Sequence, residues 1–150
     1  MAVMKILQTG DETLRKISEP VKTFDINLWN LLSDMKDTLE EAKGAGLAAV
    51  QVGVLKRIFI VSVEEGFYEF INPKILGTSG SQYGAEGCLS VKGKWGDVKR
   101  PKKVTLEAFD RYGKKFKIVA RDFFAKAVCH EYDHLDGILY TDKADNLRDE

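Results

Sequence analysis

The sequence predicts an α+β fold in which mostly antiparallel β-strands pack against two principal helices. Apolar residues recur at helical spacing over 25–43 and again over 123–135. Between these segments lie short runs of β-branched or alternating residues, separated by turn signals. The chain has 150 residues, of which 44% are hydrophobic and 31% charged, and this is enough to bury one core. Residues 1–150 are therefore predicted to form a single domain.

The first helix is predicted to extend from Asp25 to Lys43. Asp25 is a suitable N-cap residue, and Gly44 stands where a glycine commonly follows a helix C-terminus. Steps of three and four residues place one apolar face along this segment, formed by Leu28, Leu31, Leu32, Met35, Leu39 and Ala42. We expect this face to be buried.

Two strands are expected after the first helix. Leu55–Val63 is rich in β-branched residues and apolar on both faces, which predicts a buried strand. Tyr68–Asn72 predicts another strand, which ends before Pro73. Residues 77–84 have the composition of a loop.

A β-hairpin is predicted further along the chain. Apolar residues alternate with polar ones over 104–108 and again over 116–118. The segment 110–113 between them, Asp-Arg-Tyr-Gly, has the composition of a turn. We therefore expect two antiparallel strands here.

The second helix is predicted from Phe123 to about Leu135, with Asp122 as its N-cap and Gly137 past its end. It carries the pattern His-Glu-x-x-His at residues 130–134. Residues four apart on a helix share one face, so both imidazoles can bind one metal ion. The alternative is that both histidines are packed in the core without a metal.

Glu131 lies between the two histidines and is predicted to point inward. With roughly 100° per residue it falls within the apolar stripe of the helix, whereas Lys126, Cys129 and Asp133 fall on the opposite side. Burial raises the pKa of a carboxyl group, and a nearby metal cation lowers it. A glutamate under both influences is suited to proton transfer.

The third metal ligand must be a cysteine or a carboxylate, because the chain has only two histidines. A catalytic metal site usually has three protein ligands and one open position. Cys129 points roughly 100° away from His130 on the helix and cannot easily join it. Cys88 lies in a separate segment, Glu86–Ser90, and has no such restriction. Its alternative role is that of a small buried hydrophobic residue.

Charge and hydropathy exclude several classes of function. Acidic and basic residues number 23 each, so no net field favours nucleic acid or an anionic membrane. We find neither a signal peptide nor an apolar run of membrane-spanning length, and the protein is expected to be cytoplasmic with reduced thiols.

Three segments together resemble the signature motifs of the peptide deformylase family. They are Gly44–Gln51 (GAGLAAVQ), Glu86–Ser90 (EGCLS) and His130–His134 (HEYDH), in the family's order and approximate spacing. Each motif is weak or moderate alone, but the combination is highly specific. The resemblance implies an α+β fold whose mostly antiparallel sheets pack around a central metal-binding helix. It also implies removal of the formyl group from N-formylmethionyl nascent peptides, with ribosome association as a further implication.

The resemblance also implies roles for individual residues. The metal ligands would be Cys88, His130 and His134. The ion would be one divalent metal, Fe(II) in the first place, with nickel, cobalt or zinc as alternatives. Glu131 would be the general acid and base. The side-chain amide of Gln51 and the backbone N–H of Leu89 would bind the formyl oxygen.

Further residues are expected around the substrate. Gly46 would bind the substrate backbone through its own main chain, with the small residue Ala45 beside it. Phe124 and Ala127 are candidate walls of a methionine pocket, although core packing explains them equally well. Arg100 is interpreted as a solvated surface residue.

Two other functions remain open at this point. A zinc endopeptidase shares the His-Glu-x-x-His pattern, but such enzymes usually take their third ligand downstream, and residues 135–150 contain no histidine. A metal-stabilised binding module without catalysis normally uses four protein ligands, and the sequence offers three good ones.

Overall fold

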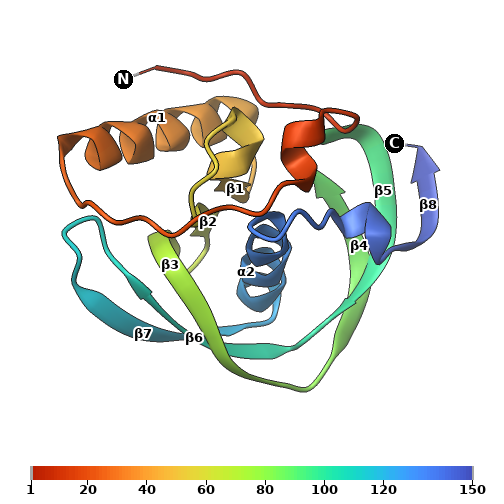
Figure 1. Cartoon of the computed structure of the whole chain (residues 1–150). Coiled ribbons are helices and arrows are strands. Elements are labelled where there is room, and N and C mark those ends of the chain that lie inside the picture. The colour runs from red at the N-terminus through yellow and green to blue at the C-terminus, as the bar shows by residue number, and fades with distance from the viewer. Residues whose placement is uncertain (1, 150) are drawn as a thin grey trace.

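The computed structural model describes residues 2–149 as an α+β fold with two antiparallel sheets and two long helices, as predicted (Figure 1). The α-helices are α1 (Ile26–Ala42) and α2 (Phe123–His134), and three short 3-10 helices are η1 (Glu12–Arg15), η2 (Ala49–Val52) and η3 (Tyr140–Asp142). The strands are β1 (Gly46–Ala48), β2 (Ile58–Val63), β3 (Gly66–Ser79), β4 (Gln82–Cys88), β5 (Val91–Arg100), β6 (Lys103–Phe109), β7 (Lys115–Arg121) and β8 (Asp145–Asp149). Neither helix is both long and apolar enough to cross a membrane.

Helix α1 begins and ends close to its predicted limits. The carboxylate of Asp25 accepts hydrogen bonds from the N–H groups of Asn27 and Leu28, which confirms it as the N-cap. The helix ends at Lys43, which adopts the left-handed conformation that ends many helices. The predicted apolar face is largely buried, through Leu28, Leu32, Met35 and Leu39.

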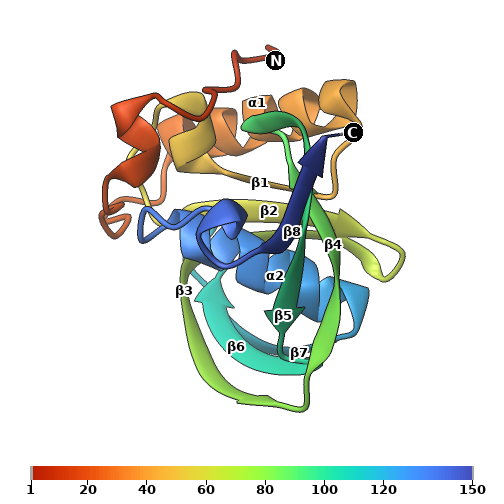
Figure 2. The ribbon, with the colours of Figure 1, turned by 90° about the vertical axis from the view of Figure 1, so that its right-hand side faces the viewer.

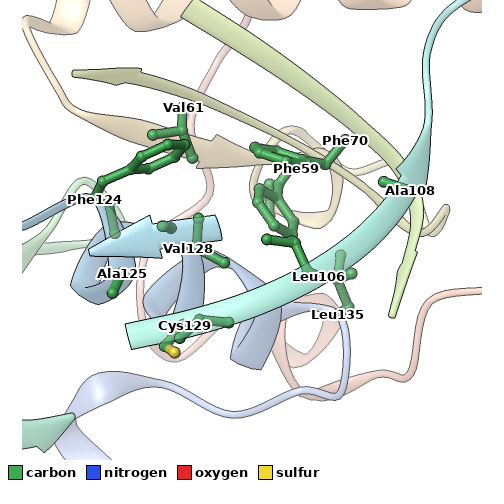
Figure 3. Close-up of a cluster of buried hydrophobic side chains, with 14 of the residues drawn as sticks. Phe59, Val61, Phe70, Leu106, Ala108, Phe124, Ala125, Val128, Cys129 and Leu135 are labelled. Carbon is green, nitrogen blue, oxygen red and sulfur yellow. The ribbon is translucent and has the colours of Figure 1, made fainter. Parts of the chain in front are cut away.

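The larger sheet has five strands in the order β1-β2-β3-β6-β7, all antiparallel. Strand β2 is buried on both faces, as predicted, because the two helices lie on opposite sides of it (Figure 2). Alternate residues of β2 therefore enter different cores: Phe59 and Val61 pack beside α2, whereas Ile58 and Ile60 pack beside α1. Figure 3 shows the first of these cores, with Phe59 and Phe70 between the sheet and α2.

Strand β3 is longer than predicted. It continues through Pro73 to Ser79, so the predicted strand end before Pro73 was wrong. The register shifts between Ile71 and Lys74, which places Pro73 within a bulge where no regular ladder hydrogen bond is required. The predicted loop over 77–84 was also wrong, because β3 and β4 occupy all of it except residues 80 and 81.

The predicted hairpin is confirmed as β6 and β7, which pair from Lys103↔Arg121 to Phe109↔Lys115. Its turn is held by Asp110, whose carboxylate accepts hydrogen bonds from the N–H groups of Tyr112 and Lys114. Gly113 has φ +82°, a value that glycine adopts readily.

The smaller sheet has three strands in the order β4-β5-β8. It lies across α2 from the larger sheet, as Figures 1 and 2 show. Helix α2 contacts β1, β2 and β7 on one side and β5 on the other. This position explains why Cys129 is buried although the helical wheel placed it on a polar side. A helix between two sheets is covered on more than its apolar stripe.

Candidate active site

Helix α2 brings both histidines of the His-Glu-x-x-His pattern to one face. The ring centroids of His130 and His134 are 5.3 Å apart. Both side chains are buried, with His134 fully enclosed. Their spacing and burial allow them to bind a single ion while the helix holds their positions.

Cys88, the last residue of β4, completes a cluster with these histidines. Its Sγ lies 3.5 Å from Nε2 of His134. The ligand atoms of Cys88, His130 and His134 all lie within 4.8 Å of one another. Two ligands of a tetrahedral ion, with one sulfur at about 2.3 Å and one nitrogen at about 2.0 Å, stand roughly 3.5 Å apart. The cluster therefore fits one metal ion.

The same cluster leaves a coordination position open. Within residues 2–149 three potential ligands gather here, which is the number that catalytic sites use and one fewer than structural sites use. Cys129 does not take part: its side chain packs in the core between α2 and the larger sheet, as Figure 3 shows. The imidazole and thiolate donors suit a transition metal rather than calcium or magnesium.

His130 is oriented by a buried ion-pair network. Its Nδ1 lies 2.9 Å from Oε1 of Glu86, and this leaves Nε2 for the ion. Arg100 donates two hydrogen bonds of 2.9 Å to the carboxylate of Glu86 and one of 2.7 Å to Asp133. Burial acts to raise the pKa of Glu86, but the bonds from Arg100 and His130 outweigh it and lower that pKa to about 2.

Arg100 is therefore not a solvated surface residue, and that expectation was wrong. Its side chain is 3% exposed. Alternation along β5 turns Arg100 inward together with Val98, and its charge is balanced by carboxylates from β4 and α2. The sequence did not predict strand β5, so the inward orientation of Arg100 could not be predicted either.

Glu131 is buried beside the cluster with one oxygen free. Its side chain is 4% exposed, and among the described residues its Oε1 has no hydrogen-bond partner. Burial raises the pKa of the carboxyl to about 7. Gly46 makes room for this group, because a Cβ at residue 46 would lie 2.6 Å from Oε2 of Glu131. The carboxyl group is thus largely enclosed by protein and available for proton transfer.

Gln51 presents an oriented amide to the same pocket. Its Oε1 accepts a 2.8 Å hydrogen bond from the N–H of Ala48. Its Nε2 lies 3.0 Å from Oγ of Ser90 and 3.7 Å from Sγ of Cys88. Because the carbonyl end is held by the backbone, the NH₂ end must face the cysteine. Within residues 2–149 the backbone N–H of Leu89 donates to no protein acceptor.

The outer edge of β1 provides backbone groups beside these side chains. The carbonyl of Ala45 accepts a hydrogen bond from Ser62 in β2, so its polar groups face the sheet. Hydrogen-bonding directions alternate along an antiparallel strand, so the N–H and C=O of Gly46 point the other way. The bond from Ala48 to Gln51 agrees with this alternation.

A cleft of about 1010 Å³ runs over the site. Its floor includes Gly46, Gln51, Cys88, Leu89, His130 and Glu131. Its walls come from the N-terminal segment, the end of α1, the β4–β5 hairpin and the start of α2. A volume of this size accommodates a short peptide segment rather than a single water molecule.

Residues 3–150 match the sequence profile of a family described as polypeptide deformylase. The chain belongs to the polypeptide deformylase family. It is 54% identical over 143 residues to a peptide deformylase of Caldicellulosiruptor bescii, which covers 95% of this chain and 86% of that relative. It is 49% identical over 150 residues to a peptide deformylase of Acetivibrio thermocellus, which covers 100% of this chain and 88% of that relative.

Solved structures of peptide deformylases share the fold. A crystal structure of a peptide deformylase from Legionella pneumophila has a TM-score of 0.93 and 42% identity, and the match covers 97% of this chain and 88% of that chain. Another, from Thermotoga maritima, has a TM-score of 0.94 and 33% identity, with coverage of 97% and 99%. The predicted fold class is thereby confirmed as that of the deformylase family.

The structure gathers most of the site residues that the sequence predicted for a deformylase, but not all of them. Ala127 lines the cleft, with Phe123 before it, which is 56% exposed. Phe124 instead points into the core, as Figure 3 shows. Its ring stacks on Tyr68, with the ring centroids 5.0 Å apart. Successive residues at the start of a helix point about 100° apart, so only Phe123 of the pair can face the cleft.

Sequence reasoning missed several residues around this deformylase site. Glu86 stands two residues before Cys88 in the same motif, and its side chain orients His130. Ser90 contacts the amide of Gln51. Trp95 lines the cleft, and its ring lies close to Gly87, where an added Cβ would approach it within 3.1 Å. Glu86 and Ser90 lie in the same short motif as Cys88, which was a signal for these two residues, whereas no signal in the sequence indicated Trp95.

Proposed function

We propose that this chain hydrolyses the formamide of N-formylmethionyl peptides at the Cys88, His130 and His134 cluster. Family membership makes the chain an enzyme that removes N-formyl groups from nascent peptides. The observation that carries the residue assignment is the buried carboxylate of Glu131, with one free oxygen, beside three converging metal ligands. That arrangement joins a metal site to a proton carrier in one cleft.

A divalent ion held by these ligands would supply Lewis acidity that makes water a competent nucleophile near neutral pH. Glu131 takes the proton that the attacking water loses, at its free Oε1 or at Oε2 facing Gly46. It then delivers this proton to the nitrogen of the departing amine. Burial raises the pKa of this carboxyl to about 7 and a bound cation would lower it, so the group can both accept and release a proton.

Gln51 and Leu89 stabilise the oxygen of the formyl group as negative charge develops on it. The Nε2 of Gln51 faces the cysteine side of the site, and the N–H of Leu89 follows Cys88 directly. One N–H of the Gln51 amide is held by Ser90, which leaves the other N–H for the formyl oxygen. The N–H of Leu89 has no protein acceptor within residues 2–149. Donors of this kind contribute about 3 kcal/mol each to transition-state stability.

The substrate backbone binds along the outer edge of β1. The N–H and C=O of Gly46 face the cleft, and its missing side chain leaves room for both the peptide and Glu131. Ala127 and Phe123 form the apolar wall toward which the methionine side chain points. Phe124 is not part of this wall, because it packs in the core.

The alternative functions have less support. An endopeptidase would need a third ligand after His134, whereas the ligand that completes the cluster is Cys88, which precedes it. A structural metal site would have four protein ligands. It would also give no reason for an unpaired buried carboxylate next to the ion.

We further propose Fe(II) as the ion, with nickel, cobalt and zinc as alternatives, since thiolate and imidazole donors accept all four. The 150 residues act as one catalytic domain in the cytoplasm. The substrate class places the enzyme near the ribosome, and co-sedimentation with ribosomes carrying formylated nascent chains tests this association. Elemental analysis of protein purified without oxygen tests the metal.

The reaction itself is tested by formate release. Protein loaded with iron or nickel under anaerobic conditions is mixed with formyl-Met-Ala-Ser, with unformylated Met-Ala-Ser as the control. We expect rapid release of formate that a chelator abolishes and that added metal restores. A folded, metal-loaded protein that releases no formate contradicts the proposed activity.

Replacement of Cys88 distinguishes the deformylase hypothesis from the peptidase hypothesis. Cys88→Ser is expected to reduce bound metal and formate release together, because a hydroxyl is a far weaker ligand than a thiolate. Cys129→Ser is the matched control, since Cys129 packs in the core and outside the cluster. Full metal content and activity in Cys88→Ser would remove Cys88 from the ligand set.

A further inference from the structure

The turn between β4 and β5 carries two parts of the proposed site. Cys88 pairs with Val91 across the hairpin, so Leu89 and Ser90 form the two-residue turn. The sulfur of Cys88 belongs to the metal-ligand cluster, and within residues 2–149 the N–H of Leu89 donates to no protein acceptor. The β4–β5 pairing thus ends at Cys88, and the next residue, Leu89, carries the proposed oxyanion donor.

The N-terminal segment closes over this turn. The side-chain Nε2 of Gln8 donates to the carbonyl of Leu89 at 2.9 Å and to the carbonyl of Ile6 at 3.3 Å. The N–H of Thr9 donates to the carbonyl of Ser90 at 2.7 Å. Both turn carbonyls are therefore held by residues about 80 positions away in the sequence.

The same segment also reaches the second proposed donor. The N–H of Leu7 donates to the carbonyl of Gln51 at 2.7 Å, and the side chain of Gln51 contacts Ser90. The backbone of Gln51 and the turn at Leu89 are thus held in one frame by three consecutive residues. Of the three, Gln8 is the one that acts through its side chain.

We propose that Gln8 is a positioning residue for deformylation, which fixes the Leu89 turn so that the N–H of Leu89 meets the formyl oxygen. This inference rests on the proposed function. Donors stabilise an oxyanion only when they stand about 2.7–3.1 Å from the place where it forms. Groups in such a site have to stay within about 0.5 Å of their productive positions. The bond from Thr9 holds the turn at Ser90, and the Gln8 amide holds it at Leu89, the residue that carries the donor.

The chain contains a matched control for this bond. The Nε2 of Gln82 also bridges two backbone carbonyls, those of Pro101 at 3.0 Å and Asp122 at 2.7 Å. Both glutamines are half-buried. Gln82 does not line the cleft, whereas Gln8 does. Removing either amide costs the fold two similar hydrogen bonds, but only one of the two losses affects the Leu89 turn.

The experiment compares Gln8→Ala, Gln8→Glu and Gln82→Ala as metal-loaded enzymes. Steady-state release of formate from formyl-Met-Ala-Ser gives kcat and KM, and elemental analysis verifies equal metal content. Amide hydrogen exchange over residues 88–91 gives a readout that does not depend on turnover. Glutamate keeps the size of Gln8 but, when ionised, offers no N–H to the carbonyl of Leu89, so it separates hydrogen bonding from packing.

We expect kcat to fall about tenfold in both Gln8 variants, with KM changed less than twofold and exchange at 88–91 accelerated. Gln82→Ala should keep kcat within twofold and leave this exchange unchanged. Unchanged kcat in the Gln8 variants overturns the proposal, and so does an equal loss in Gln82→Ala. If the wild-type enzyme releases no formate, the proposed function fails, and the exchange data still report whether Gln8 rigidifies the turn.

Discussion

The residue with the strongest chemical role in this proposal is Glu131, and its environment explains why. Its carboxyl is removed from water by the packing of α2 between two sheets, and burial raises its pKa to about 7. Its Oε1 is free next to three metal ligands, so it can accept the proton of the attacking water in the proposed reaction. The sequence pattern placed Glu131 correctly on the inward side of the helix, because the spacing of residues along a regular helix determines the side on which each one lies.

Glu131→Gln is expected to keep the fold and the bound metal while kcat falls at least about a hundredfold, because an amide cannot carry the proton. The measurement is formate release at equal metal content, with circular dichroism as a check of folding. Glu41→Gln is the matched control, since Glu41 is exposed on the wall of the same cleft. Near-normal activity of Glu131→Gln would exclude the carboxylate from proton transfer.

Gly46 is a second residue whose role can be tested on its own. In Gly46→Ala the new Cβ would lie 2.6 Å from Oε2 of Glu131, so the carboxylate must move. A displacement of about 1 Å at a reacting group can cost about a hundredfold in rate, and we expect kcat/KM to fall by that order. Gly77→Ala is the comparison, because a Cβ there meets nothing within 4 Å. Equal kcat/KM in the two variants would contradict this role for Gly46.

At the level of single residues, the predictable part of the site was the part carried by spacing. The two histidines and Glu131 follow from one turn of helix, and Cys88 and Gln51 from the resemblance of short motifs. Phe124 was a candidate wall of the methionine pocket, but it packs in the core. A helical wheel identifies the apolar residues of a helix and does not show which of them face a cleft. Glu86 and Arg100 pair across two strands, and no spacing rule connects them.

Among the elements, the two helices were predicted well and the smaller sheet was not. Strand β5 contains Gly93 and Gly96 together with several lysines, so it has no clear alternation of apolar and polar residues. Its buried partners, Leu139 and Tyr140, come from a distant segment. The pairing of β5 with β8 therefore depends on tertiary contacts that a local pattern cannot reveal.

The residues that precede the two helices, Asp25 and Asp122, differ in conformation and bonding, and replacing them is expected to change the stability of the protein in opposite directions. Asp25 caps α1 with its carboxylate, whereas Asp122 precedes α2 with φ 56° and ψ −124° and makes no capping bond. Asp122→Gly should therefore stabilise the protein by about 1 kcal/mol, because glycine adopts this conformation without strain. Asp25→Ala should destabilise it by about 1 kcal/mol.

Thermal unfolding of both variants, at equal metal loading, measures these effects. The midpoint should rise for Asp122→Gly and fall for Asp25→Ala. A fall in both would mean that the side chain of Asp122 stabilises the start of α2 more than its backbone conformation costs.

At the scale of the whole molecule, one network joins the smaller sheet to the central helix. Arg100 in β5 binds Glu86 in β4 and Asp133 in α2, and Lys143 lies 2.9 Å from the same Asp133. The charges of this network compensate one another in the interior. It therefore fixes the distance between the strand that carries Cys88 and the helix that carries both histidines.

Arg100→Met should lower the free energy of unfolding by about 3–5 kcal/mol, because it removes the buried guanidinium that pairs with both Glu86 and Asp133. Urea denaturation of the metal-free protein measures this without interference from the ion. Arg148→Met is the control: its ion pair with Asp97 lies on the surface, so its removal should leave the stability almost unchanged. A similar small loss for Arg100→Met would show that the network contributes little to stability.

The outward-facing edge of β1 has a consequence for what the enzyme can process. Newly made proteins share a formylated methionine and differ from the second residue onward, so no side-chain pocket beyond the first could suit them all. The peptide group is the one feature that every such chain repeats, and in the proposed binding mode Gly46 offers an N–H and a C=O to it while contributing no side chain of its own. A catalyst that recognises its substrates by this shared unit can serve an entire proteome with a single active site.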